Sequence, residues 1–253
     1  MTTKIITNNT AGGDYSGTVD TNLNSFSPTS PNSSDIGIEM DNMGSAYPGV
    51  GLLKFTGLSN ITGPVTVSAV TLSLYLYQEN PSLWNCTLNL RRMLRNWTNS
   101  ATWNTYDGTN NWTTAGAQSD GNDRATPASG SFPNWSPSSN GVYYDLTGSA
   151  GMIADVQGWI NGTLNNYGWL MECTDGTNAQ DYKRPQSADG TNGNRPKLSV
   201  TYSSGGGFFR TVFGGALSGL GVGGKFFQNP LQRTAWKRLR GIIVPSNYGE
   251  VAP

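Results

Sequence analysis

The 253-residue sequence contains no histidine, and this absence excludes several kinds of catalytic and metal site. Neither a Ser-His-Asp nor a Cys-His nucleophile can form, and zinc or haem would find no imidazole ligand. Cysteine is almost as rare, because only Cys86 and Cys173 are present. Two thiols are too few for a four-cysteine metal site. Paired carboxylates are the catalytic arrangement that the composition leaves open.

Charged side chains are also scarce, at 13% of the residues, against roughly 25% in an average soluble domain. Their signs are distributed unequally along the chain. Residues 1–202 hold ten basic and fifteen acidic side chains, a net charge of −5, whereas residues 203–253 hold six basic and one acidic, a net charge of +5. This asymmetry predicts an acidic globular domain, residues 1–202, followed by a basic interaction segment, residues 203–253.

Long apolar runs are missing as well. Residues 1–9 contain no apolar stretch of the roughly 7–15 residues that a secretory signal needs. The longest uncharged run after residue 202 is the glycine-rich segment 211–224, of 14 residues, and a membrane-spanning helix needs about 20. We therefore expect the protein to be made and folded in the host cytoplasm without a signal peptide.

The strongest pattern present is an alternation of apolar and polar side chains, which is typical of half-buried strands. It is clearest in residues 65–77, where Val70, Leu72, Leu74 and Leu76 fall on one face. The other predicted strands are residues 50–55, 86–93, 142–146, 168–173 and 197–202. Many strands with a single helix predict an all-β sandwich.

The single predicted helix lies in residues 149–163. Its apolar side chains recur at helical spacing, at Met152, Ile153, Val156, Trp159 and Ile160. This pattern predicts a short amphipathic helix whose apolar stripe covers one end of the sandwich.

Tryptophan and tyrosine in or near the polar loops are candidate carbohydrate-binding residues. Residues 98–141 contain almost no aliphatic side chains but several aromatic ones. Trp112, Trp135 and Tyr143 have rings that could stack on sugars in a binding site. The alternative is that these rings pack inside the protein, which their large area favours.

The loop aspartates offer oxygen ligands of the kind that calcium prefers, but their spacing matches no EF-hand loop. We expect pairs such as Asp107-Gly108 to form turns, and we predict neither a metal nor a cofactor. The sequence places no two acidic residues across a cleft, so we predict no enzymatic activity. We expect Cys86 and Cys173 to be buried thiols, with a disulfide formed after release from the cell as the alternative.

A series of short segments resembles one known family. Residues 52–55 (LLKF) and the strand at 65–77 precede Asn96-Trp97 and 101–104 (ATWN), and 156–162 (VQGWING) leads into 166–170 (NYGWL) and 194–202 (NRPKLSVTY). In this order the segments resemble the DNRLRE domain, a bacterial and phage jelly-roll module related to carbohydrate-binding modules. The resemblance covers roughly residues 14–202. It implies a jelly-roll β-sandwich of surface, adhesive or polysaccharide-associated proteins, without catalytic activity of its own.

Residues 203–253 have a different composition. Ser203 to Gly207 (SSGGG) predicts a flexible hinge. Asn229-Pro230 predicts the start of a short basic helix, which Gly241 would end. We therefore predict an extended glycine-rich C-terminal arm that contains one short helix.

The arm combines apolar anchors with basic side chains. Exposed apolar segments of this size usually mark a surface that binds a partner. A membrane surface and nonspecific contact with nucleic acid are the alternatives to a protein partner. The candidate partner-binding residues are Phe208, Phe209, Phe213, Phe226, Phe227, Trp236, Arg233, Lys237, Arg238 and Arg240.

Together these features predict a non-enzymatic structural protein of a phage particle, as a capsid decoration, head fibre or tail-associated protein. We expect it in the virion, with the arm bound to a capsid or tail protein of the same particle and the sandwich facing outward. A surface glycan and a second copy of the chain are further candidate partners, whereas we predict no specific binding of nucleic acid. The alternatives are a carbohydrate-binding or adhesion module and a membrane-associated protein of a lipid-containing virus.

Overall fold

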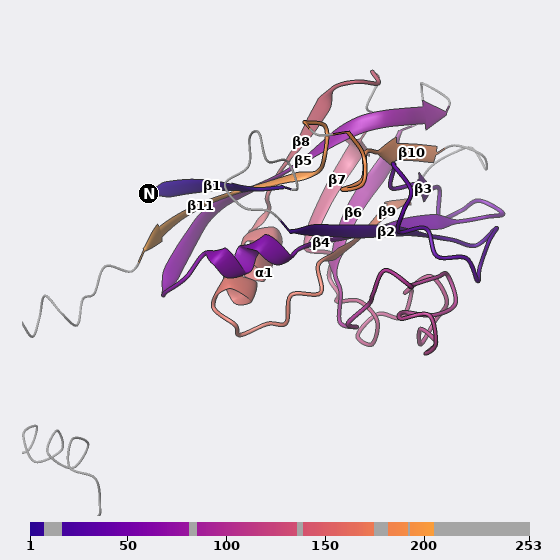
Figure 1. Cartoon of the computed structure of the whole chain (residues 1–253), viewed down its shortest axis with the longest axis horizontal. Helices are drawn as coiled ribbons and strands as arrows, with labels where there is room; N and C mark the ends of the chain where they lie inside the picture. Colours follow the sequence, from indigo (N-terminus) through magenta and orange to yellow (C-terminus); the bar gives the residue numbers. More distant parts are fainter. Residues whose placement is uncertain (8–16, 81–84, 136–138, 175–181, 192, 205–253) are drawn as a thin grey trace, which may run out of the picture. The chain divides into compact units, whose positions relative to one another are not determined.

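The computed structural model describes residues 1–7, 17–80, 85–135, 139–174, 182–191 and 193–204 of the chain. These residues are mostly β-structure, with one α-helix and one short 3-10 helix (Figure 1). All pairings between the strands are antiparallel. The all-β class predicted from the alternation is therefore confirmed.

Two sheets make up the described structure. The strands of the first sheet, in spatial order, are β1 (Thr2–Ile6), β11 (Lys197–Ser204), β5 (Val65–Asn80), β10 (Tyr182–Pro185) and β3 (Met40–Asp41), with β8 (Tyr143–Thr147) also paired to β5. The strands of the second sheet, in spatial order, are β2 (Thr18–Asn24), β4 (Gly49–Phe55), β9 (Trp169–Thr174), β6 (Cys86–Arg92) and β7 (Gly130–Trp135).

The main apolar core joins residues from both sheets. Leu72 and Leu198 of the first sheet belong to the same buried cluster as Leu88 and Met171 of the second. The alternating face of β5 is buried, with Val70, Leu72, Leu74 and Leu76 at most 1% exposed. The apolar side chains at every second position of β5 are therefore the buried ones, as the alternation in the sequence predicts.

Helix α1 (Ala150–Ile160) lies where the sequence predicts a helix. Ser149 is its N-cap, and the Ser149 hydroxyl accepts a hydrogen bond from the Met152 amide at 3.4 Å. Met152, Val156 and Trp159 are buried in the main core, as the apolar stripe requires. The helix contacts β5, β7 and the 3-10 helix η1 (Thr56–Asn60), and so covers one side of the core.

The irregular segment 94–129 covers the other face of the second sheet. Leu52 of β4 and Leu170 of β9 form a second buried cluster with Trp97, Trp112 and Ala117 of this segment. Their chain neighbours Leu53 and Met171 belong instead to the main core. Figure 1 shows the segment as the coiled chain below β2 and β4. Because both faces of this sheet are covered, β4 and β9 are apolar runs and not alternating ones.

Candidate functional site

The predicted hinge starts too early, because Ser203 and Ser204 are the last residues of β11 and pair with Thr66 and Val65 of β5. The rest of the predicted arm, residues 205–253, lies outside the described residues. Its candidate partner-binding residues lie outside the described residues, and their role stays a prediction. They are Phe208, Phe209, Phe213, Phe226, Phe227, Trp236, Arg233, Lys237, Arg238 and Arg240.

Two of the three candidate sugar-binding aromatics are buried. Trp112 is 4% exposed in the second cluster, and its Nε1 donates a hydrogen bond to the Thr102 carbonyl at 2.9 Å. Trp135, at the end of β7, is 8% exposed and packs in the main core. A ring that is this deeply buried offers no face to a sugar in the described conformation. Both tryptophan side chains pack inside the protein, which is the alternative that their large area favours.

The third candidate, Tyr143, is half-buried on β8. The Tyr143 hydroxyl lies 2.5 Å from the Gly193 carbonyl oxygen and 3.0 Å from that of Arg195, so it fastens this loop to the sheet. The ammonium of Lys197 lies 3.9 Å from the ring centroid, and Tyr75 contacts the ring edge-to-face. Burial, with a smaller effect of Tyr75, raises the pKa of Tyr143 to about 12. The contacts of Tyr143 are those of a structural residue.

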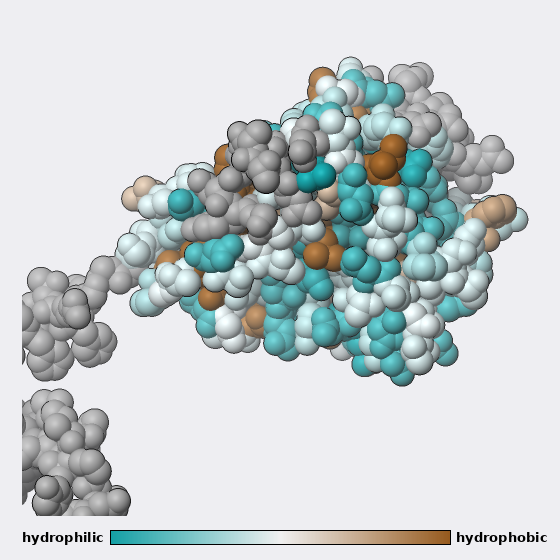
Figure 2. All heavy atoms as spheres, viewed as in Figure 1, coloured by the Kyte–Doolittle hydropathy of each residue, from teal (hydrophilic) through white to brown (hydrophobic). Residues whose placement is uncertain are grey.

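A different pair of aromatic side chains is exposed. Phe26 and Tyr47 are 70% and 57% exposed, and their rings meet at right angles with centroids 5.2 Å apart. We call this pair the aromatic corner. Figure 2 shows a mostly hydrophilic described surface in this view, with hydrophobic residues scattered over it. An exposed, paired aromatic contact is therefore a distinct feature of the domain.

The aromatic corner lies at the end of the β2–β4 ladder. Asn24 and Gly49 form the last paired position, and the Ser25 amide then donates to the Pro48 carbonyl at 3.1 Å. Phe26 follows in a turn, where its amide donates to Asn24 Oδ1 at 2.8 Å. Both rings are thus attached directly to a paired ladder, which fixes their backbone positions.

Polar side chains surround the same end of the ladder. The Asn24 amide nitrogen lies 3.1 Å from Glu39 Oε1 and 3.5 Å from Asp41 Oδ2. Gly49 leaves room for this arrangement, because a Cβ there would collide with Asp41 Oδ2. Burial and the neighbouring Glu39 carboxylate raise the pKa of Asp41 to about 7. Near neutral pH this carboxyl can therefore donate a hydrogen bond as well as accept one.

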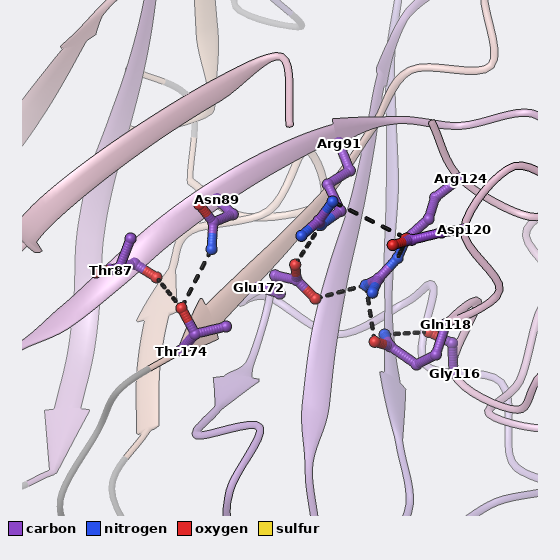
Figure 3. Close-up of polar contacts among 9 residues, drawn as sticks. All are labelled: Thr87, Asn89, Arg91, Gly116, Gln118, Asp120, Arg124, Glu172 and Thr174. Atoms are coloured by element: carbon purple, nitrogen blue, oxygen red, sulfur yellow. Dashed lines mark hydrogen bonds and ion pairs between the residues drawn. The ribbon is translucent and has the colours of Figure 1, made fainter. Parts of the chain in front are cut away.

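A separate ionic cluster fastens segment 94–129 to the second sheet (Figure 3). Glu172 of β9 is 2% exposed and receives hydrogen bonds from Arg91 Nε at 2.5 Å and Arg124 Nη1 at 2.6 Å. Arg124 also donates to Asp120 at 2.8 Å and to Gln118 at 2.7 Å. Both oxygens of Glu172 are engaged by guanidinium groups, which is the arrangement of a structural clamp.

Two of the described loop aspartates, Asp107 and Asp123, have structural partners. Asp123 is buried and accepts hydrogen bonds from the Thr113 and Thr114 amides, both at 3.0 Å. Asp107 accepts from the amides of Thr109 and Asn110 in the predicted Asp-Gly turn. Within the ranges that the structure describes, no three Cys, Asp or Glu side chains are grouped to hold a metal ion.

The two cysteines are buried, and the thiol of Cys173 is a poor nucleophile. Cys86 and Cys173 are free and buried in the main core. Burial, with the neighbouring Cys86, raises the pKa of Cys173 well above its usual value. A thiol with a raised pKa is less often the reactive thiolate. The positions of both residues agree with the expectation of buried thiols.

Comparison with known proteins adds no functional assignment. No known family model matches the sequence, and no curated protein was found to be similar to it. In the part of the chain that the structure describes, no helix is long and apolar enough to cross a membrane.

Proposed function

We propose that this chain is a non-enzymatic structural protein of a phage particle. A DNRLRE-like jelly-roll domain, residues 1–202, faces outward, and the arm, residues 203–253, binds a capsid or tail protein of the same particle. The observation that carries the proposal is the division of the sequence into a domain of net charge −5 and an arm of net charge +5 with its own aromatic anchors.

The packing of the described residues supports separate roles for the domain and the arm. They form two apolar clusters, to which α1 contributes the buried residues Met152, Val156 and Trp159, so most of the core comes from strands and loops. The clusters take in Trp97, Trp112 and Trp169, which the loops and strands supply. A domain with a core of this kind can present its polar loops to water while a separate segment makes the attachment.

The arm would bind through two kinds of contact. Phe208, Phe226 and Trp236 are large apolar side chains of the type that fill pockets at the centre of an interface. Arg233 and Lys237 carry charge that accelerates association with an acidic partner surface. This mechanism requires neither a metal nor a reactive group.

The test is incorporation of variants into particles. A phage that encodes a chain ending at residue 204 should produce a folded domain that is missing from purified particles, as measured by immunoblot and mass spectrometry. Phe26→Ala in the full-length chain is the matched control, because it removes an exposed aromatic ring from the domain and leaves the arm intact. Normal incorporation of the truncated chain would contradict the proposal.

Two further measurements separate the alternatives. If the full chain floats with liposomes and the chain ending at residue 204 does not, while the virion contains lipid, the arm binds a membrane and not a protein. If the protein releases reducing ends from polysaccharides, the non-enzymatic part of the proposal is wrong. The aromatic corner, Phe26 and Tyr47, is the described feature that favours a carbohydrate-binding role as the second candidate function.

A further inference from the structure

The exposure of the aromatic corner is costly for the isolated domain. Leaving large aromatic side chains in water forgoes about 2 kcal/mol or more of burial for each ring. Most of the described tryptophans are buried, namely Trp97, Trp112, Trp135, Trp159 and Trp169. Phe26 and Tyr47 instead contact each other at the surface. Such an arrangement is typical of a binding surface.

The corner is also held in place before any ligand binds. Asn24 Oδ1 accepts from the Phe26 amide, and the Ser27 amide donates to the Asn24 carbonyl at 3.3 Å, so Phe26 lies in a hydrogen-bonded turn. On the other strand Tyr47 precedes Pro48, whose carbonyl is paired with the Ser25 amide. A backbone that is ordered before binding loses little conformational entropy when a ligand binds. The site is therefore suited to a small, weakly binding unit.

Asn24 connects the rings to a set of hydrogen-bonding groups. The same side chain that orders Phe26 contacts the carboxyl groups of Glu39 and Asp41. The hydrogen bond from the Phe26 amide to Asn24 Oδ1 places these polar groups beside the turn that carries Phe26. A sugar ring that stacks on the aromatic corner can thus reach the polar groups of Asn24, Glu39 and Asp41 with its hydroxyls.

The charge of this region selects among ligands. The Arg184 guanidinium is 3.6 Å from Asp35 and 4.0 Å from Glu39, and the Asp41 carboxyl shares the Asn24 amide with Glu39. Carboxyl groups therefore outnumber the guanidinium, and an anionic ligand would meet like charge. Uncharged hydroxyl groups can donate to the carboxylate oxygens without that penalty.

We propose that Phe26 and Tyr47 bind an uncharged sugar unit of a surface polysaccharide, with Asn24, Glu39 and Asp41 hydrogen-bonding to its hydroxyls. The apolar face of a pyranose stacks on an aromatic ring, and the two perpendicular rings hold the sugar from two sides. The inference rests on the proposed function only in that the domain faces outward. It does not depend on what the arm binds.

The experiment measures binding of the full-length chain to immobilised polysaccharides. The probes are three neutral polymers, galactomannan, mixed-linkage β-glucan and dextran, and two anionic ones, alginate and heparin. We expect binding to at least one neutral polymer. Phe26→Ala and Tyr47→Ala should each weaken it about tenfold, the change that about 1.4 kcal/mol produces. Tyr47→Trp should retain it, because a stacking surface remains.

Tyr77→Ala is the matched control, because Tyr77 is an exposed tyrosine of β5, 40% accessible and outside the corner. Unchanged binding of this variant, with weaker binding of both corner variants, would support the site. Equal loss in all three variants, no binding to any neutral polymer, or binding to the anionic polymers alone would overturn it. Capture of another virion protein by the corner, lost in Phe26→Ala, would also overturn it in favour of protein docking.

Failure of this inference differs from failure of the proposed function. Phe26→Ala particles that retain the protein but show unchanged polysaccharide binding would contradict only the sugar site. Particles that retain the chain ending at residue 204 would contradict only the anchoring role of the arm.

Discussion

At the scale of single residues, the most informative group is a buried acid. Asp20 of β2 is 5% exposed and accepts a hydrogen bond from the Ala188 amide at 2.7 Å. Burial is the main cause that raises its pKa from 3.8 to about 7, and repulsion from Asp189 adds to it. A group with this pKa shift makes the stability of the fold depend on pH.

We predict that Asp20→Asn stabilises the protein at pH 8 and not at pH 4. Between pH 4 and 7 the folded state of the native protein holds a proton that the unfolded chain releases, so its free energy of unfolding falls as the pH rises. The asparagine side chain keeps an oxygen that can accept the hydrogen bond from the Ala188 amide, and it carries no charge. The gain at pH 8 relative to pH 4 should be at most about 4 kcal/mol, from 1.36 kcal/mol per pKa unit.

Urea unfolding at pH 4, 6 and 8 checks this prediction. Asp107→Asn is the control, because hydrogen bonds from Asn110 and Thr109 in a surface turn lower the pKa of Asp107. That variant should lose stability above pH 4 and gain none. A constant difference between Asp20→Asn and the native protein across the pH range would show that Asp20 is ionised in the folded state.

At the scale of elements, the ionic clamp helps to hold segment 94–129 on the second sheet, beside the apolar contacts of the second cluster. We predict that Glu172→Gln destabilises the fold by about 3 kcal/mol, because it leaves two guanidinium groups beside a buried neutral amide. Hydrogen exchange of the amides of residues 94–129 should accelerate more than that of β5. Asp120→Asn, whose side chain is 47% exposed, should cost about 1 kcal/mol or less. Equal costs would contradict the clamp.

The elements also show how far the sequence predicts the fold. The alternation in β5 and the stripe of α1 each report one buried face, and both predictions are confirmed. β2 was not predicted, because Asp20, Asn22 and Asn24 alternate with the other side chains and make hydrogen bonds where apolar residues were expected. Polar partners of this kind, such as Asp35 and Glu39, are distant in sequence and leave no local pattern.

The same limit applies to the candidate site. Tryptophan in a polar loop looks accessible in the sequence, but Trp112 is buried because the loop folds back on a sheet whose outer face is apolar. The apolar outer residues Leu52 and Leu170 were the available signal, since both strands lack clean alternation. Phe26 and Tyr47 are 21 residues apart, and only the pairing of β2 with β4 brings them together.

At the scale of the whole molecule, the basic and the apolar residues of the arm should affect two different rates. The basic residues should affect association with the partner, and the apolar residues should affect dissociation. Purified full-length protein should rebind to particles that lack it, and charge reversal at Arg233, Lys237 and Arg238 should slow association about tenfold in low salt, since steering acts on the approach. At about 1 M salt, where the screening length is about 3 Å, the difference should disappear.

Phe226→Ala with Phe227→Ala should instead accelerate dissociation at every salt concentration, because desolvated apolar contacts are made only after docking. Surface plasmon resonance on immobilised particles measures both rates, and Phe26→Ala in the domain should change neither. If charge reversal altered only the dissociation rate, the basic residues would act within the bound complex, and the +5 charge of the arm would not be a steering device. Slower association in the charge-reversal variant and faster dissociation in the phenylalanine variant would together show that the arm both attracts its partner and holds it.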